Sequence, residues 1–307
     1  MKKKRTLLIQ ILTGGVLAII LASTIPSEAV DTLRVTSPDP VLEQWRWRTY
    51  GPSSGLAGVI REITEDRDGN IWFATDRGAQ RYDGRQWITY TTENGLAHNE
   101  VRTVYQTRDG TMWFGTFGGG ISQFDGETWT TYTTADDLPS NYVWSQGLHQ
   151  ARDGTLWAGF FHAEGLYRPP GGISRFDGQG WTTIEVPVGL PRPVIMDIYE
   201  TSDGSLWFLT WGHGVLRYDG ANWTWYTTED GLAGKNAVEM LESRDGSLWF
   251  TCWGRKGISR FDGKQWRIYT SQDGLPEGVD IGSIWQTADG TVWAGSHTGA
   301  FCRFDGE

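Results

Sequence analysis

The sequence contains few of the residues from which most enzyme sites are built. Its 307 residues include two cysteines, four methionines and five histidines. The histidines occur singly, without the His-x-x-His or His-Glu-x-x-His spacing of a zinc site. A Gly-x-x-x-x-Gly-Lys-Ser phosphate loop is also absent. We therefore expect no catalytic residue, metal or cofactor, although distant loops, such as those carrying His213 and His297, could still assemble a site.

The two cysteines are too few for a disulfide framework. Cys252 and Cys302 take the places of Thr75 and Gln80 in the first copy of the repeat described below. We therefore expect them on different strands of adjacent units. In an exported protein they could form one bridge, and a buried structural thiol is the alternative.

Basic residues are fewer than acidic ones. The chain has 27 Lys and Arg against 37 Asp and Glu, a net charge of −10. Residues 1–29 hold four of the basic and one of the acidic residues, so the remainder carries −13. A protein this acidic repels the phosphate backbone of nucleic acids. Nucleic acid is therefore excluded as a partner.

Long apolar runs are absent outside the N-terminus. Residues 2–5 are basic, residues 7–22 are mostly apolar, and Ser27-Glu28-Ala29 offers small residues for cleavage. This pattern predicts a signal peptide at 1–29, then a linker at 30–42 and a periplasmic or secreted protein. An uncleaved anchor is the alternative, because residues 6–24 approach the roughly 20 residues that span a bilayer. We expect membrane contact only there.

One pattern is present six times. Each copy has an Asp-Gly pair, two further residues and a Trp, and then an aromatic-Asp-Gly triplet. Successive copies are 41, 44, 50, 42 and 44 residues apart, a period typical of a four-stranded propeller blade. The tryptophans of the six copies are Trp72, Trp113, Trp157, Trp207, Trp249 and Trp293.

Each copy divides into four short strands, because apolar and polar residues alternate between glycine-containing turns. In the second copy we expect strands at 101–107, 111–116, 121–125 and 128–133. The Asp-Gly pairs between them favour tight hairpins, since Gly accepts positive φ and Asp bonds to the backbone ahead. We therefore interpret the twelve Asp-Gly pairs of the repeat as turns, and not as metal or catalytic carboxylates.

The two ends of the repeat array are complementary. The chain stops after the sixth aromatic-Asp-Gly, where the other copies begin their outer strand. Trp47, Tyr50, Gly55 and Leu56 have the same offsets as Trp87 and the residues that follow it. We therefore predict a six-bladed, all-β propeller at 43–307, closed by an N-terminal strand that pairs with the last blade. A fragment of a longer array is the alternative.

Residues that depart from the repeat are candidates for function, since those that recur in every copy are most simply scaffold. Twelve of the 18 tryptophans recur and are expected to pack between blades. Length varies mostly in the connection between the second and third strands, on the face opposite the Asp-Gly hairpins. The candidate ligand-binding residues on this face are Phe117, Trp144, Phe160, His162, Trp211, His213, Trp253, Arg255 and His297.

Aromatic rings beside amide, imidazole and cationic donors suit a polar ligand with a flat face, such as a glycan or a peptide. The rings cover the apolar face of the ligand, while the donors bind its hydroxyl or carboxylate groups. Aromatic packing that only orders the loops is the alternative for any single residue. Trp211 and Trp253 occupy equivalent positions in adjacent units and are the first residues to test.

The copies resemble a known repeat family. Residues 109–116 read Asp-Gly-Thr-Met-Trp-Phe-Gly-Thr, and Gly-Gly-Ile-Ser-Gln-Phe-Asp-Gly follows at 119–126. These units resemble two-component regulator propeller repeats, which are similar to the periplasmic sensing half of hybrid histidine kinases. The resemblance implies a sensor or signal-transduction component that binds a ligand, a membrane sensor or another exported protein outside the cytoplasm. Because no kinase or receiver module accompanies the repeats, we expect no phosphotransfer by this chain.

Two alternatives remain. The Asp-Gly-x-x-Trp-Phe core also resembles the repeats of streptogramin lyase type propellers, which place a His and an acid near the channel with a magnesium ion. No residue here matches that active site position by position, so the resemblance assigns no catalytic role to His213 or His297. The other alternative is an assembly scaffold for exported proteins, to which Trp45 and Trp225 could contribute an apolar rim.

Overall fold

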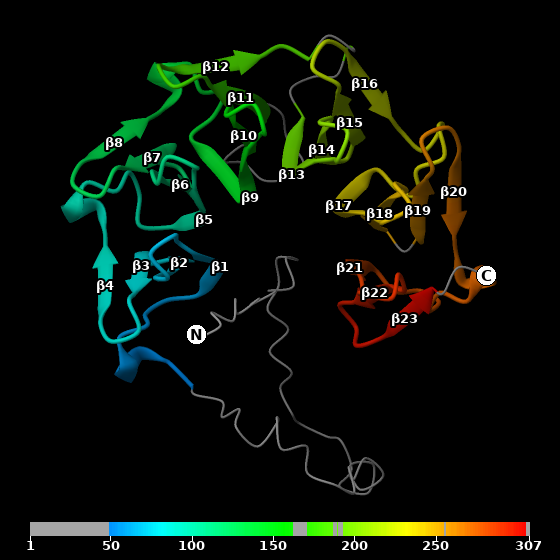
Figure 1. Cartoon of the computed structure of the whole chain (residues 1–307), viewed down its shortest axis with the longest axis horizontal. Helices are drawn as coiled ribbons and strands as arrows, with labels where there is room; N and C mark the ends of the chain where they lie inside the picture. The colour runs from blue at the N-terminus through cyan, green and yellow to red at the C-terminus, as the bar shows by residue number, and fades with distance from the viewer. Residues whose placement is uncertain (1–48, 162–170, 187–188, 190–192, 255, 305–307) are drawn as a thin grey trace, which may run out of the picture.

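The computed structural model describes residues 49–161, 171–186, 189, 193–254 and 256–304. These residues form 23 β-strands and four short 3-10 helices. The strands make six antiparallel sheets, which follow one another in chain order around a central axis (Figure 1). The first five sheets have four strands and the sixth has three. The all-β class and the repeated four-stranded unit are therefore confirmed.

Within each sheet the strands pair in chain order, from the innermost strand outward. The first sheet contains β1 (Ile60–Glu65), β2 (Ile71–Thr75), β3 (Gly78–Tyr82) and β4 (Trp87–Tyr90), and the second contains β5 (Val101–Gln106), β6 (Met112–Thr116), β7 (Ile121–Phe124) and β8 (Trp129–Tyr132). The third contains β9 (Tyr142–Gln150), β10 (Leu156–Phe161), β11 (Gly172–Phe176) and β12 (Trp181–Ile184), and the fourth contains β13 (Val194–Glu200), β14 (Leu206–Trp211), β15 (Gly214–Tyr218) and β16 (Trp223–Tyr226). The fifth contains β17 (Asn236–Glu242), β18 (Leu248–Trp253), β19 (Ile258–Phe261) and β20 (Trp266–Tyr269), and the sixth contains β21 (Ile281–Gln286), β22 (Val292–Ser296) and β23 (Phe301–Phe304).

The Asp-Gly pairs form turns, as predicted. In the hairpin between β7 and β8, Asp125 Oδ1 accepts the backbone N–H groups of Glu127 and Thr128 at 2.9 and 2.7 Å. Gly126 has a φ of 107°, which a side chain would disfavour. The bonds from Thr128 and Glu127 lower the pKa of Asp125 to about 2. The carboxylate is thus occupied by the turn itself.

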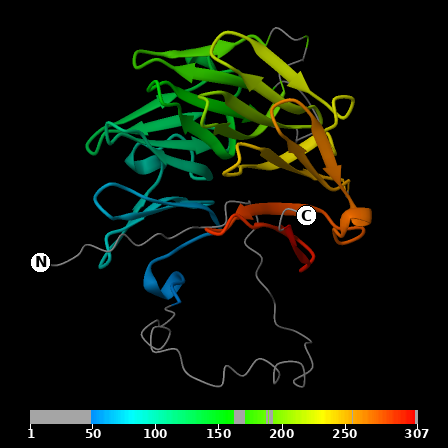
Figure 2. The same ribbon diagram turned by 45° about the vertical axis from the view of Figure 1, so that its right-hand side comes forward.

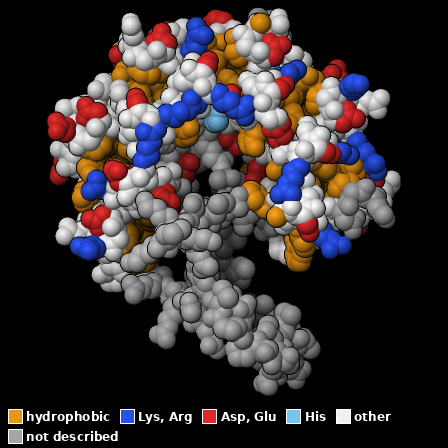
Figure 3. Space-filling view, viewed as in Figure 1, with side chains coloured by type: hydrophobic (Ala, Val, Ile, Leu, Met, Phe, Trp, Pro, Cys, Tyr) orange, Lys and Arg blue, Asp and Glu red, His pale blue; other side chains and the backbone are white. Residues whose placement is uncertain are grey.

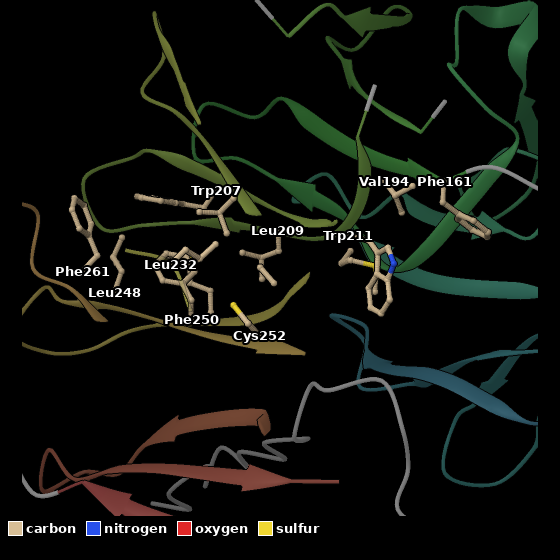
Figure 4. Close-up of a cluster of buried hydrophobic side chains, with 14 residues drawn as sticks. Phe161, Val194, Trp207, Leu209, Trp211, Leu232, Leu248, Phe250, Cys252 and Phe261 are labelled. Carbon is tan, nitrogen blue, oxygen red and sulfur yellow. The ribbon is translucent and has the colours of Figure 1, made fainter. Parts of the chain in front are cut away.

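Tryptophans join adjacent sheets. Trp207 of β14 stacks on Tyr226 of its own sheet at 5.6 Å between ring centroids, and it contacts Phe250 of the next sheet at 5.4 Å. Only 2% of Trp207 is exposed. Figure 4 shows Trp207 and Phe250 within one buried cluster that also contains Leu209 and Phe261. Figure 2 shows the resulting arrangement, in which the sheets pack face to face around the axis. The predicted scaffold role of this repeated Trp is confirmed.

The Gly-Leu pair after the first outer strand, Gly95-Leu96, has a packing role in the link to the next sheet. Gly95 has a φ of 111°, and a Cβ there would lie 2.9 Å from Cβ of Trp129 in the second sheet. Leu96 is buried, and Thr91 accepts the N–H of Glu93 in the preceding 3-10 turn η5 (Thr92–Asn94). The same kind of turn occurs at η4 (Pro52–Ser54), η6 (Thr134–Asp136) and η7 (Ser271–Asp273).

The first residues described behave as such a link. The Tyr50 ring lies 5.5 Å from Tyr82 and 5.9 Å from Trp87 of the first sheet. Tyr90, at the end of β4, lies 5.4 and 5.6 Å from the equivalent rings of the second sheet. Tyr50 thus occupies the position expected of a residue that ends an outer strand.

Ring closure itself is not confirmed. Trp47 and the strand expected to close the ring lie outside the described residues, as do the predicted signal peptide at 1–29 and linker at 30–42. Trp293 of the sixth sheet is partly exposed, whereas the five equivalent tryptophans are at most 4% exposed. The described part of the chain therefore shows five packed interfaces between successive sheets and leaves the sixth unobserved.

The cysteines are both free thiols. Cys252 lies buried on β18, and Cys302 lies half-buried on β23. Burial raises the pKa of the Cys252 thiol to about 12. Cys252 is therefore a buried structural thiol, and it forms no disulfide with Cys302. Among the described residues, no helix has the length and apolar character needed to cross a membrane.

Candidate functional site

The topology gives the disc two different faces. The hairpins between first and second strands, and between third and fourth strands, lie at one end of each sheet and form the hairpin face. The connections between second and third strands, and the links between sheets, lie at the other end. We call this end the loop face. Of the predicted ligand-binding residues, Phe117, Trp211, Trp253 and His297 lie at or directly after strand ends on this face.

One aromatic group spans the fourth, fifth and sixth sheets. Trp211, at the end of β14, meets Trp253, at the end of β18, edge to face at 5.3 Å. Trp253 meets His297 in the same way at 5.6 Å. Trp211 is only 7% exposed, Trp253 is half-buried, and His297 is exposed. The structure thus brings together three predicted residues, of which Trp253 and His297 offer surface to a ligand.

A second aromatic group spans the second and third sheets. Phe117 lies 5.2 Å from Tyr142 and 5.5 Å from Phe161 between ring centroids. Trp144 on β9 meets Phe161 edge to face at 5.1 Å. Phe161 is buried, and it supports Phe117 and Trp144, which are partly exposed. Phe161 belongs to the same buried cluster as Trp211, and Figure 4 shows the two rings near Val194.

Phe160 is a correction to the predicted set. It was expected to bind a ligand, but it lies on β10 with no exposed surface, packed between the second and third sheets. Adjacent strand residues point to opposite faces, so Phe160 and Phe161 belong to different clusters. Phe160 is therefore core and unavailable to a ligand.

The remaining predicted residues are peripheral or lie outside the described part. His213 is half-buried in the turn between β14 and β15, where its carbonyl accepts the indole N–H of Trp225. Burial and the nearby Lys235 lower the pKa of His213, so its imidazole is neutral at pH 7. His162 and Arg255 lie outside the described residues.

Sequence reasoning missed two arginines on the innermost strands. Arg102 of β5 lies 4.5 Å above the Phe117 ring and 5.5 Å from the Trp144 ring, measured from Cζ. Arg61 of β1 is its counterpart in the first sheet, since each precedes its repeated Trp by eleven residues. An alignment of the copies on their repeated tryptophans places the two arginines at the same position.

A group of carboxyl side chains along the axis was also missed. Glu62, Asp197 and Glu239 each stand ten residues before a repeated Trp, on the inner strands β1, β13 and β17. Glu62 Oε2 accepts the N–H of Val104, and Glu239 Oε2 accepts that of Ile284, both at 3.2 Å. These bonds link inner strands of adjacent sheets. Acidic side chains are visible inside the central opening in Figure 3.

The axial carboxyls resist ionisation. Burial raises the pKa of Glu62 to about 7, and that of Asp197 and Glu239 to about 8. Charge on Glu62 raises the pKa of Asp197 further, and charge on Asp197 does the same for Glu239. The described residues contain no group of three or more His, Cys, Asp or Glu side chains placed to hold a metal ion. At neutral pH, Asp197 and Glu239 are therefore mostly protonated, whereas Glu62 is only partly protonated.

The chain matches a sequence family in three places. Residues 54–77, 95–118 and 189–212 match the two component regulator propeller family. Each match begins in the link before a sheet or shortly before its inner strand, and ends at or just beyond the second strand. No curated protein is significantly similar to the chain over its sequence.

Solved structures share the fold. The extracellular domain of a putative hybrid two component system from B. thetaiotaomicron is 16% identical, with a TM-score of 0.50. A catalytically inactive virginiamycin B lyase from Staphylococcus aureus, solved with quinupristin, is 21% identical, with a TM-score of 0.57. PorZ, a surface component of the type-IX secretion system of Porphyromonas gingivalis, is 16% identical, with a TM-score of 0.58.

The extent of these matches differs. The alignment with the sensor domain covers 80% of this chain and 43% of that domain. The alignment with the lyase covers 80% of this chain and 79% of the lyase, and the alignment with PorZ covers 78% of this chain and 37% of PorZ. The chain thus spans about two fifths of the sensor domains it matches. At these identities the likeness shows the fold. The three matched segments confirm the resemblance of the chain to two-component regulator propeller repeats that was found in the sequence.

Proposed function

We propose that this protein is a non-catalytic, exported sensor propeller that binds a glycan or peptide ligand on its loop face. The observation that carries the proposal is the continuity of Trp211, Trp253 and His297 across three sheets. A packing role would be served by buried rings alone, yet Trp253 and His297 keep exposed surface. Half-exposed aromatic rings on a rigid support are the usual means of binding a flat polar ligand.

The family supports a role in signalling. Two-component regulator propeller repeats occur in this chain, and the sensor domain that shares its fold is extracellular. Location in the periplasm or outside the cell is consistent with the basic and apolar N-terminus. A membrane sensor or another exported protein would then receive the signal.

The test is a binding screen with matched tryptophan variants. Neutral and acidic oligosaccharides and short peptides are titrated into the mature protein, and the melting temperature is followed, since a ligand that binds only the folded state raises it. Trp253→Ala should abolish the shift, whereas Trp285→Ala, an exposed Trp near the hairpin end of β21, should not. Equal responses of the two variants would refute the loop-face site.

The lyase is the second candidate, because its structure and this chain cover each other almost equally. A screen that responds to magnesium with a streptogramin, and to neither glycan nor peptide, would favour it over the sensor. A protein that responds to no small ligand but is retained by other exported proteins would be the scaffold. Both outcomes would contradict the proposed function.

We also propose that residues 43–48 form the fourth strand of the sixth sheet and close a six-bladed ring. A pocket between the fifth and sixth sheets is lined by Tyr269, Gly274 and Phe304. One sheet earlier, the equivalent residues are Tyr226 of the fourth sheet, Gly231 of the following link and Phe261 of the fifth sheet. They pack against Trp266 of the outer strand of the fifth sheet. Trp47 has the repeat position of Trp266 and is the side chain expected to fill the pocket.

Closure can be tested by paired substitutions. Trp47→Ala should lower the melting temperature strongly, as loss of an interior packing Trp does, whereas Trp45→Ala should have little effect because Trp45 is not a repeated position. Equal, small effects of the two substitutions would show that the sixth sheet is completed in another way.

A further inference from the structure

Arg61 and Arg102 share one counter-ion on the loop face. Arg102 Nη2 donates to Glu100 Oε1 at 2.5 Å, and Arg61 Nη2 lies 3.9 Å from the same oxygen. Within the described part of the chain, neither guanidinium forms an ion pair with a second carboxylate. The two arginines therefore carry one more positive charge than their partner neutralises.

The neighbouring charges do not remove this excess. Asp76 is close enough to influence Arg102, but its Oδ1 accepts the backbone N–H of Val59 at 2.7 Å. Arg77, exposed in the same connection, adds a further positive charge. Counting Arg77, the arginines of this region outnumber its carboxylates Glu100 and Asp76 by three to two, in a protein whose net charge is −10. A local positive site on an acidic protein attracts anions to that place alone.

The surroundings hold the guanidinium of Arg102 in place. Its position over Phe117 and beside Trp144 is that of a cation–π contact, and only 13% of its side chain is exposed. Arg61 is more open, with 33% of its side chain exposed. Nε of each arginine is shielded and donates to no acceptor among the residues described. The pair is therefore ordered, incompletely hydrogen-bonded and reachable through Arg61.

We propose that Arg61 and Arg102 form a binding site for a carboxylate group of the ligand. A carboxylate fits the planar fork of a guanidinium through two parallel hydrogen bonds, which an ammonium group cannot form. The rings of Phe117 and Trp144 lie beside the fork and cover an adjoining apolar surface of the ligand. The carboxylate comes from an acidic sugar or from a peptide. This inference rests on the proposed function and specifies the chemistry that the loop face recognises.

The test compares ligands that differ only in the carboxylate. Calorimetric titrations of the mature protein use trigalacturonic acid against neutral galactotriose, and acetyl-Ala-Glu-Glu-Ala-amide against its Gln counterpart. We expect one acidic ligand to bind at least tenfold more tightly than its neutral match, which identifies the source. High salt should weaken the binding of that acidic ligand and leave the binding of its neutral match unchanged.

Arg61→Gln is the informative variant, because Arg61 is partly exposed and its replacement spares the core. It should remove the preference for the acidic ligand, and Arg61→Lys should restore only part of it. Arg85→Gln, which removes the same charge from an exposed hairpin on the opposite face, is the control and should bind like the wild type. Melting temperatures verify that all three variants are folded.

The outcomes separate the two proposals. Equal binding of acidic and neutral ligands, lost in Trp253→Ala but kept in Arg61→Gln, would overturn the carboxylate site and leave the proposed function standing. Binding of neither pair, by a protein that also fails the wider screen, would overturn both. If inorganic phosphate bound as tightly as the acidic ligand, the two arginines would form a general anion site, which would contradict specificity for carboxylate.

Discussion

The two faces of the disc use the same strands for different purposes. On the hairpin face, each copy repeats the same Asp-Gly turn, and carboxylates such as Asp125 bond to the backbone of their own turn. On the loop face, positions at strand ends that are equivalent in the repeat carry Asp76, Trp211 and Trp253 in different copies. Repetition therefore marks the parts that every blade needs in order to fold, and departure from it marks the parts free to bind.

The difference between the faces has an energetic basis. A repeated Trp such as Trp207 is buried between two sheets, so its loss leaves a cavity that rigid neighbours cannot fill. Trp253 is only half-buried, so water can fill much of the space that its truncation leaves. The same residue type should thus be essential for stability in one place and for binding in the other.

The largest effect is expected from truncating the interior Trp. Trp207→Ala should reduce the free energy of unfolding by about 3–5 kcal/mol, through lost contacts with Tyr226 and Phe250 and a residual cavity. Trp253→Ala should cost clearly less while abolishing ligand binding. Denaturant titrations of both variants measure this contrast, and similar losses of stability would remove the distinction between the faces.

A smaller effect is expected from the axial carboxyls, which belong to neither face. The pKa of Glu239 is about 8 in the folded protein and 4.5 in the unfolded chain, so folding takes up a proton between these values. Stability is therefore greatest at low pH within this range, and it falls by a few kcal/mol as the pH rises from about 5 to above 8.

Glu239→Gln should remove the part of this decline that Glu239 causes, because the amide has no proton to lose. The variant should unfold at a higher temperature than the wild type at pH 8.5, and at a similar temperature at pH 5. Thermal unfolding across this pH range measures the difference. Parallel curves for variant and wild type would mean that Glu239 ionises normally in the folded state.

The smallest effect tests a polar anchor near the hairpin face. Ser243 Oγ accepts the indole N–H of buried Trp249 at 3.0 Å. Ser243→Ala should leave this N–H without a partner and cost about 1–2 kcal/mol. Lys256→Ala, at an exposed loop-face position, should change stability by less than about 0.5 kcal/mol. Chemical denaturation measures the stability of both variants. An unchanged stability of Ser243→Ala would show that the hydrogen bond to Trp249 contributes nothing.

Much of the fold could be predicted from single residues and their spacing. In the second copy, the expected strand at 101–107 is found at Val101–Gln106, and that at 121–125 is found at Ile121–Phe124. The accuracy follows from the local nature of the signals, because glycine turns and period-2 alternation act over a few residues. The pattern could not predict which side of β10 Phe160 would occupy, since the position of that strand's end was unknown.

The candidate site could be predicted only in part. Trp211, Trp253 and His297 were found because they interrupt the repeat at strand ends and connections. Arg61 and Arg102 were overlooked because they lie on strands, where polar residues were assumed to be scaffold. Their meeting at Glu100 depends on how two sheets pack, which no spacing within one copy reveals.

The sequence by itself determined the repeating unit, the hairpin turns and the Trp positions, because each depends on local backbone preference and on burial that recurs in every copy. Only the tertiary structure decided which side chains from different sheets meet, such as Trp211 with Trp253, and that Glu62, Asp197 and Glu239 share the axis. These contacts join residues dozens of positions apart, and they arise when whole sheets pack together. The energy of that packing is a property of the assembled disc and is not contained in any one repeat.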